Sequence, residues 1–325
     1  MDLLRDRDID IGPLAGKRVA ILGYGNQGRA QALNLKDSGI DVVVGLRGAS
    51  GSARAAEEAG LEIALVEEAT ASADVIMFLA PDEALAGIYR EVEARIRYGA
   101  AIGFSHGLTV HFGQIHPRHD LDVFMVAPKG PGVALRSLYE RGKGMVGVWA
   151  VAQDASGKAR DLALAYGKAI GCARAGLIAS SFAEECEADL FNEGAVVWGA
   201  VPEILVAGFE TLVEAGVSPE LAYLECVGEL KLLADLIEAR GIAGMREAIS
   251  NTAELGAALG GPRVVDEHVR QNMRQVLEDV RSGRFAEALR REAADGYPEL
   301  EGARARSHSH QMERVFQDLK SLGGS

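Results

Sequence analysis

Short apolar runs rich in β-branched residues alternate with helix-like segments from residue 17 onward. The runs are RVAIL (18–22), DVVVGL (41–46), DVIMFLA (74–80), AAIGFS (100–105), DVFMVA (122–127) and MVGVWAVA (145–152). Continuous apolar runs of this length are typical of strands that are covered on both faces of a parallel sheet. The pattern therefore predicts a doubly wound, Rossmann-like α/β domain at the N-terminus.

The segment SGKARDLALAYGKAIG, residues 156–171, has apolar side chains at helical spacing. Ser156 is a suitable N-cap and Gly171 a suitable end, so the segment predicts an amphipathic helix that completes the first domain. Strand-like runs then stop, and apolar residues recur at a 3.6-residue period toward the C-terminus.

The change of rhythm predicts a domain boundary near residue 180. We expect a Rossmann domain over residues 1–181 and an all-helical domain over residues 182–325. The polar stretch ARARSHSHQ, residues 303–311, predicts a mobile segment before a last helix.

Charge and cysteine content limit the classes of partner. The chain has a net charge of −13 and a pI of about 5.1, without a run of basic residues, so nucleic acid and anionic membranes are not expected as main partners. No apolar run reaches the roughly 20 residues of a membrane span, and the charged N-terminus is unlike a signal peptide. These features predict a soluble, cytoplasmic protein.

Cys172, Cys186 and Cys226 lack CxxC spacing and have apolar neighbours, so we expect buried thiols.

A glycine motif follows the first predicted strand and precedes a helix-like segment. Gly23, Gly25 and Gly28 form GxGxxG in RVAILGYGNQGRAQALNL. In dinucleotide-binding folds the first glycine allows a tight turn, the second lets the backbone approach a pyrophosphate, and the third lets helix and strand pack closely. The N–H groups at the helix start then face the anion. A strand-to-helix turn without a ligand is the alternative, but the βαβ setting favours a dinucleotide.

The second strand lacks the acid that would bind the ribose 2′-hydroxyl of NAD about 20 residues beyond the motif. Its end reads GLRGASGS, with Arg47 where the acid is expected, and with Ser50 and Ser52 nearby. A guanidinium and two hydroxyls are suitable donors for a 2′-phosphate. The stretch therefore favours NADP, and the alternative is a solvated Gly- and Ser-rich loop.

Two pairs of acids occur in apolar helix-like segments of the second domain. Glu225 and Glu229 lie four residues apart in YLECVGELKLL, and Asp189 and Glu193 have this spacing in EADLFNEGAVVW. Residues four apart share a helix face, so such acids repel each other unless a cation lies between them. Carboxylates without His or Cys suit Mg²⁺ or Mn²⁺ better than zinc, and a bridging carboxylate can hold two ions about 4 Å apart. For either pair alone, a solvated face or a partner such as Lys231 is the competing interpretation.

Ordered motifs along nearly the whole chain resemble the ketol-acid reductoisomerases, also called acetohydroxyacid isomeroreductases, in their short class I form. The likeness is carried by GYGNQGRAQALNL, VVVGLR, APDEAL, SHGLTVHFGQI, DVFMVAPKGPG, RAGLI, DLFNE, AGFETLVEAGVSPELAYLECVGELKLL and GMREAISNTAELG. The resemblance implies an NADPH-binding domain followed by a knotted all-helical domain. It also implies a homodimer or higher homo-oligomer, in which two interlocked chains both supply metal-site residues.

The resemblance also assigns roles to residues. It implies cofactor contacts at Gly23, Tyr24, Gly25, Asn26, Gln27, Gly28, Arg47, Ser50, Ser52, Asp82, Glu83, Ala84, Leu85 and Gly132. It implies metal ligands at Asp189, Glu193, Glu225 and Glu229, and catalytic roles for His106, Lys129 and Glu229. Ser250 matches the residue that holds the substrate carboxylate, although a serine at this place can simply cap a helix.

The implied reaction needs NADPH and two Mg²⁺ ions. An alkyl group migrates within 2-acetolactate or 2-aceto-2-hydroxybutyrate, and hydride from NADPH then reduces the new ketone to a 2,3-dihydroxy acid of valine or isoleucine biosynthesis. Glu229 is the candidate for proton transfer, because a carboxylate beside other carboxylates can have a raised pKa. The alternative is a paralogue that uses NADPH and Mg²⁺ on another 2-keto acid in specialised metabolism. A non-catalytic dinucleotide-binding protein has no use for the four carboxylates together with Lys129 and His106.

Overall fold

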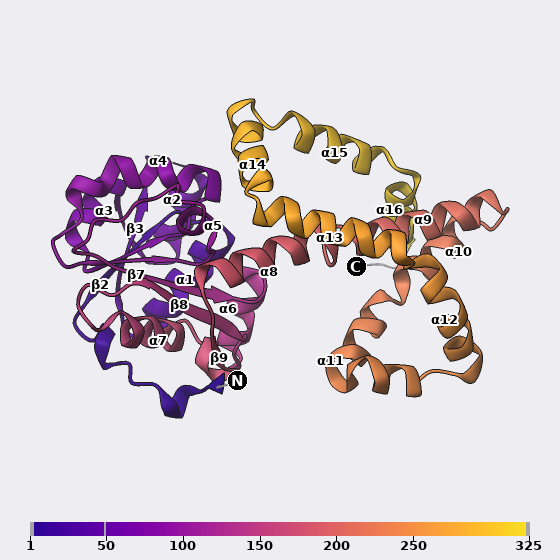
Figure 1. Ribbon diagram of the computed structural model, residues 1–325, viewed down its shortest axis with the longest axis horizontal. Coiled ribbons are helices and arrows are strands. Elements are labelled where there is room, and N and C mark those ends of the chain that lie inside the picture. Colours follow the sequence, from indigo (N-terminus) through magenta and orange to yellow (C-terminus); the bar gives the residue numbers. More distant parts are fainter. Residues whose placement is uncertain (1–2, 49, 323–325) are drawn as a thin grey trace. The chain divides into compact units, whose positions relative to one another are not determined.

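A computed structural model describes residues 3–48 and 50–322 of the 325-residue chain. Contacts within the chain divide it into two compact units, Met1–Ala188 and Asp189–Ser325. The division falls inside helix α8 (Phe182–Ala195), which begins where the helical domain was predicted to begin. The fold class is confirmed, because the first unit is a sheet covered by helices and the second is entirely helical in its described part (Figure 1).

The first unit is built around one nine-stranded sheet with the order β1-β9-β8-β7-β6-β5-β2-β3-β4. Its strands are β1 (Leu3–Leu4), β2 (Arg18–Leu22), β3 (Asp41–Leu46), β4 (Glu62–Leu65), β5 (Val75–Phe78), β6 (Ala101–Phe104), β7 (Asp122–Pro128), β8 (Gly147–Gln153) and β9 (Leu177–Ala179). The strands from β4 to β7 are parallel, and the order reverses between β2 and β5. Ligands of such sheets bind beyond the carboxyl ends of the strands at this reversal.

The sheet departs from the predicted parallel pattern at one side. Strand β8 runs antiparallel to β7, and the two-residue β1 runs antiparallel to β9. A continuous apolar run indicates that a strand is buried on both faces of the sheet, but it contains no information on the direction of the strand. The run MVGVWAVA therefore could not reveal that β8 is antiparallel to β7. Strands β1 and β4 are short and partly exposed, which explains why no long apolar run marked them.

Helices on both faces of the sheet complete the first unit's core. Successive residues of β2 face opposite sides: Val19 and Ile21 pack with α1, α6 and α7, whereas Ala20 and Leu22 pack with α3 and α4. These helices are α1 (Asn26–Asp37), α2 (Gly51–Glu58), α3 (Val66–Ser72), α4 (Asp82–Val92), α5 (Leu108–His111), α6 (Gly132–Glu140) and α7 (Ala159–Ala169), with 3₁₀ turns at Asp6–Asp8, Gly12–Leu14, Glu93–Arg95 and Cys172–Arg174. Figure 1 shows α4 and α7 on opposite sides of the sheet.

The helix predicted over residues 156–171 exists, but it begins later than expected. Ser156 is not its N-cap, because the helix begins at Ala159 with Lys158 in the N-cap position, and the Ser156 hydroxyl donates to Asp122 Oδ2 at 2.6 Å. The side chain of Asp154 accepts from the Ala159 N–H at 3.0 Å instead. The predicted end is confirmed, since Gly171 follows the helix with a left-handed φ of 91°.

The second unit continues from α8 as a series of helices. They are α9 (Ala200–Glu214), α10 (Pro219–Tyr223), a π-helical turn (Leu224–Gly228), α11 (Leu230–Glu247), α12 (Asn251–Val264), α13 (Glu267–Arg281), α14 (Arg284–Ala294), α15 (Pro298–Ser309) and α16 (Gln311–Leu322). The expected mobile segment at 303–311 is wrong, because α15 includes residues 303–309. An Arg304–Glu301 ion pair lies along this helix, and the left-handed Tyr297 precedes it.

Little of the second unit is buried within a single chain. Its small core comprises Phe209, Ala222, Met312 and Val315, from α9, α10 and α16. Helices α11 and α12 contain no buried residue. The α8–α9 segment, Phe182–Glu214, is long and apolar enough to cross a membrane by length and composition, and only 6% of its most apolar window is buried. Apolar helices exposed to this extent need a covering surface.

The burial of the cysteines follows the prediction in two positions of three. Cys172 and Cys186 are buried, and Cys226 is half-buried. Burial raises the pKa of Cys172 to about 12, so this thiol stays protonated.

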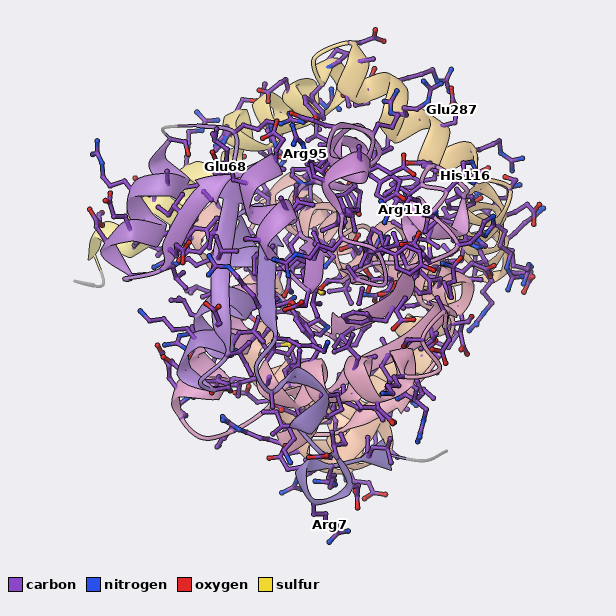
Figure 2. The ribbon with its side chains drawn as sticks, turned by 90° about the vertical axis from the view of Figure 1, so that its left-hand side faces the viewer. Arg7, Glu68, Arg95, His116, Arg118 and Glu287 are labelled. Carbon is purple, nitrogen blue, oxygen red and sulfur yellow. The ribbon has the colours of Figure 1, made fainter. Side chains whose placement is uncertain are left out.

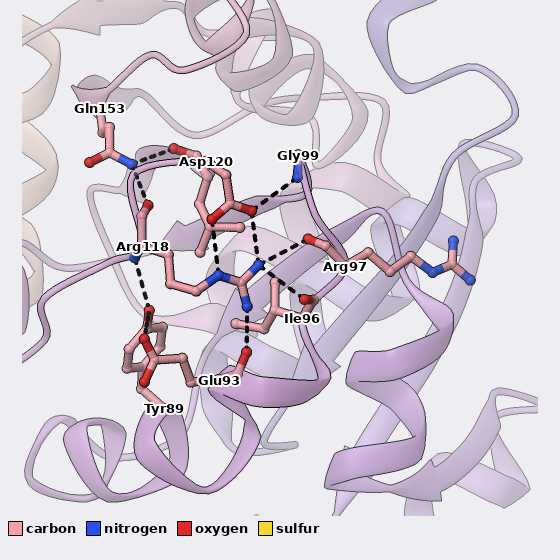
Figure 3. Close-up of polar contacts among 9 residues, drawn as sticks. Tyr89, Glu93, Ile96, Arg97, Gly99, Arg118, Asp120 and Gln153 are labelled. Atoms are coloured by element: carbon pink, nitrogen blue, oxygen red, sulfur yellow. Dashed lines mark hydrogen bonds and ion pairs between the residues drawn. The ribbon is translucent and has the colours of Figure 1, made fainter.

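Arg118 joins its own loop to the segment around the 3₁₀ turn Glu93–Arg95. Its guanidinium donates to both carboxylate oxygens of Asp120 at 3.0 and 2.9 Å, and to the backbone carbonyls of Glu93 at 2.6 Å and Ile96 at 3.1 Å (Figure 3). The hydrogen bond from Arg118 is the main cause that lowers the pKa of Asp120 to about 2. A folded pKa below the ordinary 3.8 means that this contribution to stability is complete above about pH 4 and is lost as the pH falls through 2.

Replacing Arg118 by leucine is expected to lower the free energy of unfolding at neutral pH by about 2–4 kcal/mol, because the Asp120 carboxylate loses its two bonds from the guanidinium and two backbone carbonyls lose a donor. Denaturant unfolding of the full chain measures the change. Arg95→Leu is the control, since Arg95 is exposed on the surface (Figure 2) and should change stability by less than about 0.5 kcal/mol. Equal stability of the two variants would show that the Arg118 network does not stabilise the fold.

Candidate active site

The glycine loop between β2 and α1 has the geometry of a dinucleotide cradle. Gly23 has a φ of 103°, and a Cβ there would lie 2.8 Å from the Ala80 backbone nitrogen. A Cβ on Gly28 would lie 2.2 Å from the Gly23 carbonyl oxygen, so the start of α1 can pack closely on the loop only with glycine at both positions. Around Gly25, by contrast, there is open space. The loop therefore fits a pyrophosphate above Gly25, at the N-terminus of α1.

The residues between these glycines connect the loop to the start of α6. Asn26 Oδ1 accepts from the Val133 N–H at 3.1 Å, and Gln27 Nε2 donates to the Gly130 carbonyl at 2.9 Å. A Cβ on Gly132 would lie 2.0 Å from the Asn26 carbonyl oxygen. Gly132, expected to contact the cofactor, thus lies directly against the glycine loop. Tyr24 is buried, and burial raises the pKa of its phenol.

The loop after β3 contains the expected phosphate donors. Arg47 is exposed and its Nη2 lies 3.4 Å from Glu91 Oε2 of α4. Ser50 is the N-cap of α2, and its hydroxyl accepts from the Ala53 N–H at 3.2 Å. Ser52 is in the first turn of α2, so the loop presents a helix N-terminus as well as a guanidinium. The loop itself contains no acidic residue, but Glu91 of α4 lies beside it.

The start of α4 approaches the first candidate catalytic residue. Asp82 and Glu83 lie in the first turn of α4, followed by Ala84 and by Leu85, which is buried in the core. His106, just after β6, places Nδ1 3.5 Å from Asp82 Oδ2. The structure thus brings together a predicted cofactor residue and a predicted catalytic residue.

Lys129 forms an ion pair that the sequence did not predict. Its ammonium lies 2.7 Å from Glu185 Oε1 of α8, and Glu185 Oε2 accepts from the Gly107 N–H at 2.9 Å. The Glu185 side chain is only 1% exposed, so these two donors replace the water that it would otherwise bind. His106 and Glu185 also offer a ring nitrogen and a carboxylate oxygen within 4.8 Å of each other. A sequence signal existed, because Glu185 precedes Asp189 at the same four-residue spacing that drew attention to Glu193.

The four predicted metal ligands lie on two elements of the second unit. Asp189 and Glu193 follow one another on α8, whereas Glu225 lies in the π-helical turn and Glu229 directly after it. Glu225 and Glu229 are exposed. π-Helical turns frequently occur at functional sites. Over residues 3–48 and 50–322, no cluster of three metal-type ligands includes Glu193, Glu225 or Glu229, so one chain does not assemble the four carboxylates.

Ser250 caps a helix, as its alternative interpretation stated. It is the N-cap of α12, where its hydroxyl accepts from the Ala253 N–H at 3.2 Å. Ser250 is exposed. Its capping of α12 does not test whether it also binds the substrate carboxylate, so that role stays a prediction.

The doubly wound sheet, the glycine cradle and the polar residues at the carboxyl ends of β6 and β7 define an oxidoreductase with a nicotinamide cofactor. Two family models match the chain: "Acetohydroxy acid isomeroreductase, NADPH-binding domain" over residues 13–176, and "Ketol-acid reductoisomerase, C-terminal domain" over residues 182–323. The chain belongs to the ketol-acid reductoisomerase family.

Solved structures agree with this assignment. An NADH-preferring ketol-acid reductoisomerase from an uncultured archaeon is 41% identical, with 100% of both chains covered and a TM-score of 0.96. A semialdehyde dehydrogenase NAD-binding protein from Cupriavidus necator is 20% identical, with 82% of this chain and 99% of that chain covered and a TM-score of 0.63. A pyrroline carboxylate reductase from Plasmodium falciparum is 11% identical, with 83% and 98% covered and a TM-score of 0.55. The last two are similar to this chain in fold alone.

Proposed function

We propose that this protein is a Mg²⁺-dependent ketol-acid reductoisomerase that uses NADPH. It converts 2-acetolactate and 2-aceto-2-hydroxybutyrate to 2,3-dihydroxy-3-methyl acids. The observation that carries the proposal is the Lys129–Glu185 ion pair beside His106, located past the carboxyl ends of β6 and β7 and next to the glycine loop. Oxidation of NADPH that requires both 2-acetolactate and Mg²⁺ tests it.

The protein's own polar groups support the handling of an anionic substrate. Glu185 fixes the Lys129 ammonium, which can then donate to a substrate oxygen on which negative charge develops. The second oxygen of Glu185 binds the Gly107 N–H and so fixes the loop that carries His106. Asp82 Oδ2 lies 3.5 Å from His106 Nδ1, so this carboxylate helps to orient the imidazole. The bound cofactor supplies the hydride, and the glycine cradle orients it.

Asp189, Glu193, Glu225 and Glu229 would hold two Mg²⁺ ions. Their carboxylates are the hard oxygen donors that Mg²⁺ prefers, and two pairs match the charge of two divalent ions. Bound Mg²⁺ would act as a Lewis acid on the hydroxyl and carbonyl oxygens of the substrate. Since one chain does not bring the two pairs together, each site combines Asp189 and Glu193 of one chain with Glu225 and Glu229 of another.

A second copy of this chain is therefore the expected partner. Leu232, Leu233, Leu255 and Leu259 of α11 and α12 are 40–65% exposed, although both helices are long and contain many apolar residues. Two copies that cover these faces and share the carboxylates form a homodimer with two equivalent active sites. The interlocked, knotted arrangement implied by the family resemblance is consistent with helices that lack a core of their own.

NADPH preference depends on Arg47 and the N-terminus of α2. Replacing both Arg47 and Ser52 by Asp is expected to lower kcat/KM for NADPH relative to NADH by about 30- to 100-fold, because two donors to the 2′-phosphate become repulsive carboxylates. Steady-state kinetics with both cofactors measures the ratio. Arg54→Asp, an exposed change further along α2, is the matched control and should change the ratio less than about threefold. An unchanged ratio in the double variant would refute the phosphate assignment.

A further inference from the structure

A buried amide on α1 has hydrogen-bond partners at both its nitrogen and its oxygen. Gln31 is 0% exposed, and its Nε2 donates to Gln27 Oε1 at 3.1 Å and to Ser105 Oγ at 2.8 Å. Its Oε1 accepts from the Tyr166 hydroxyl at 2.7 Å. A buried polar group is costly unless its partners are in place, and a fully satisfied network fixes the groups that it joins. The Gln31 amide is thus held in one orientation.

The partners of Gln31 lie at the loops of the active site. Gln27 belongs to the glycine motif, and its Nε2 donates in turn to the Gly130 carbonyl at 2.9 Å, directly after Lys129. Ser105 precedes His106, and its hydroxyl donates to the Val126 carbonyl at 3.0 Å on β7. One side chain therefore connects the glycine loop, the His106 loop and the Lys129 loop.

Gln27 and Tyr166 together favour one orientation of the Gln31 amide. Tyr166 extends from α7, is fully buried, and its pKa is held well above the ordinary value by burial, so its hydroxyl remains a donor. The reversed amide would place Gln31 Oε1 against Gln27 Oε1 and would direct an N–H at the Tyr166 hydroxyl. Neither loop would then receive its donor.

We propose that Gln31 and Tyr166 are positioning residues that keep the His106 and Lys129 loops in register with the glycine loop, and so place the nicotinamide for hydride transfer. The catalytic part of this inference rests on the proposed function. Neither residue touches the reacting atoms in this account; both act through Gln27, Ser105 and the backbone carbonyl of Gly130.

Tyr166→Phe tests the inference with the loss of a single oxygen atom. We expect kcat for 2-acetolactate to fall about tenfold, since a small misplacement of the reacting groups slows the chemical step. We also expect the primary deuterium isotope effect with 4-deuterated NADPH to increase, because hydride transfer then limits the rate more strongly. Partial unfolding lowers the amount of active enzyme but leaves an isotope effect unchanged, so this measurement separates positioning from stability.

Tyr139→Phe is the matched control. The Tyr139 hydroxyl lies 2.8 Å from Ser38 Oγ and joins none of the three loops, so its loss should leave both kcat and the isotope effect at the wild-type values. If Tyr166→Phe retains the wild-type isotope effect, or if both variants change it equally, the inference is overturned. Should Tyr166→Phe fail to fold, Ser105→Ala removes another bond of the Gln31 amide, and the same criteria apply.

Amide hydrogen exchange provides a readout without cofactor or substrate. The N–H groups of Gly107 and Val133 bind Glu185 Oε2 and Asn26 Oδ1, so their exchange reports how firmly the two loops are held. Tyr166→Phe should accelerate exchange at both by about tenfold, and Tyr139→Phe at neither. Wild-type exchange in Tyr166→Phe contradicts the positioning role. If the wild-type chain does not act on 2-acetolactate, the proposed function fails, while the exchange rates still decide the structural claim.

Discussion

Glu229→Gln is expected to reduce the Mg²⁺-dependent conversion of 2-acetolactate by at least about 10³-fold. The substitution keeps the size of the side chain but removes one of the negative charges proposed to hold Mg²⁺, and with it the carboxylate proposed to transfer a proton. The dissociation constant for NADPH should change less than about twofold, because the glycine cradle belongs to the other unit of the chain. Kinetics at saturating Mg²⁺ and a cofactor titration give both quantities.

Glu238→Gln is the control for this prediction. Glu238 is an exposed acid on α11, the helix that begins directly after Glu229, and its replacement makes the same change of charge. It should retain nearly wild-type activity. A comparable loss of cofactor affinity and of activity in Glu229→Gln would instead mean that Glu229 supports the fold.

Mixing two inactive variants is expected to restore activity. Asp189→Asn and Glu229→Gln should each be inactive alone, because each alters every site of its homodimer. In a heterodimer, both changes fall in one site and leave the other intact, since a site takes Asp189 from one chain and Glu229 from its partner. Random pairing makes half of the dimers mixed, so about a quarter of the wild-type activity should return. Co-expression with two different affinity tags isolates the mixed dimer, which should by itself have about half of the wild-type activity.

The controls for this experiment concern assembly. Each single variant, and their mixture without subunit exchange, should remain inactive. Wild-type assembly state should be confirmed for both variants by light scattering. If the isolated heterodimer is inactive although both variants assemble and bind NADPH, the metal ligands do not come from two chains, and the shared-site proposal is wrong.

The strands and the glycine loop were predictable because local rules determine them. The ranges of β2 and β3 match the apolar runs RVAIL and DVVVGL residue by residue. The roles of Gly23 and Gly28 follow from close approaches that any side chain would block. Periodicity and glycine placement are properties of short segments, so the sequence alone reveals them.

Features that depend on distant contacts were not predictable in the same way. The antiparallel direction of β8 leaves no mark on its composition. The capping of α7 by Asp154 was missed because Ser156 is recruited by Asp122, which is distant in sequence. The bond between Gln31 and Tyr166 joins residues 135 positions apart, and only the packing of α1 against α7 brings them together.

The candidate site was predicted more completely as a list of residues than as an arrangement. Asp82 and His106 lie together, and Gly132 lies against the glycine loop. Glu185 was missed, although its spacing from Asp189 repeats the pattern on which the metal ligands were chosen. The four-residue spacing that selected Glu225 and Glu229 assumes α-helical geometry, so it could not reveal the π-helical turn over Leu224–Gly228.

The central claim is that this chain couples alkyl migration to reduction by NADPH with the aid of Mg²⁺. The most direct measurement incubates the purified full-length protein with 2-acetolactate and NADPH, with and without Mg²⁺, while cofactor oxidation and products are followed. We predict one 2,3-dihydroxy-3-methylbutanoate formed per NADPH oxidised, with Mg²⁺ strictly required. Absence of this product with Mg²⁺ present, while another 2-keto acid is reduced without rearrangement, would contradict the account.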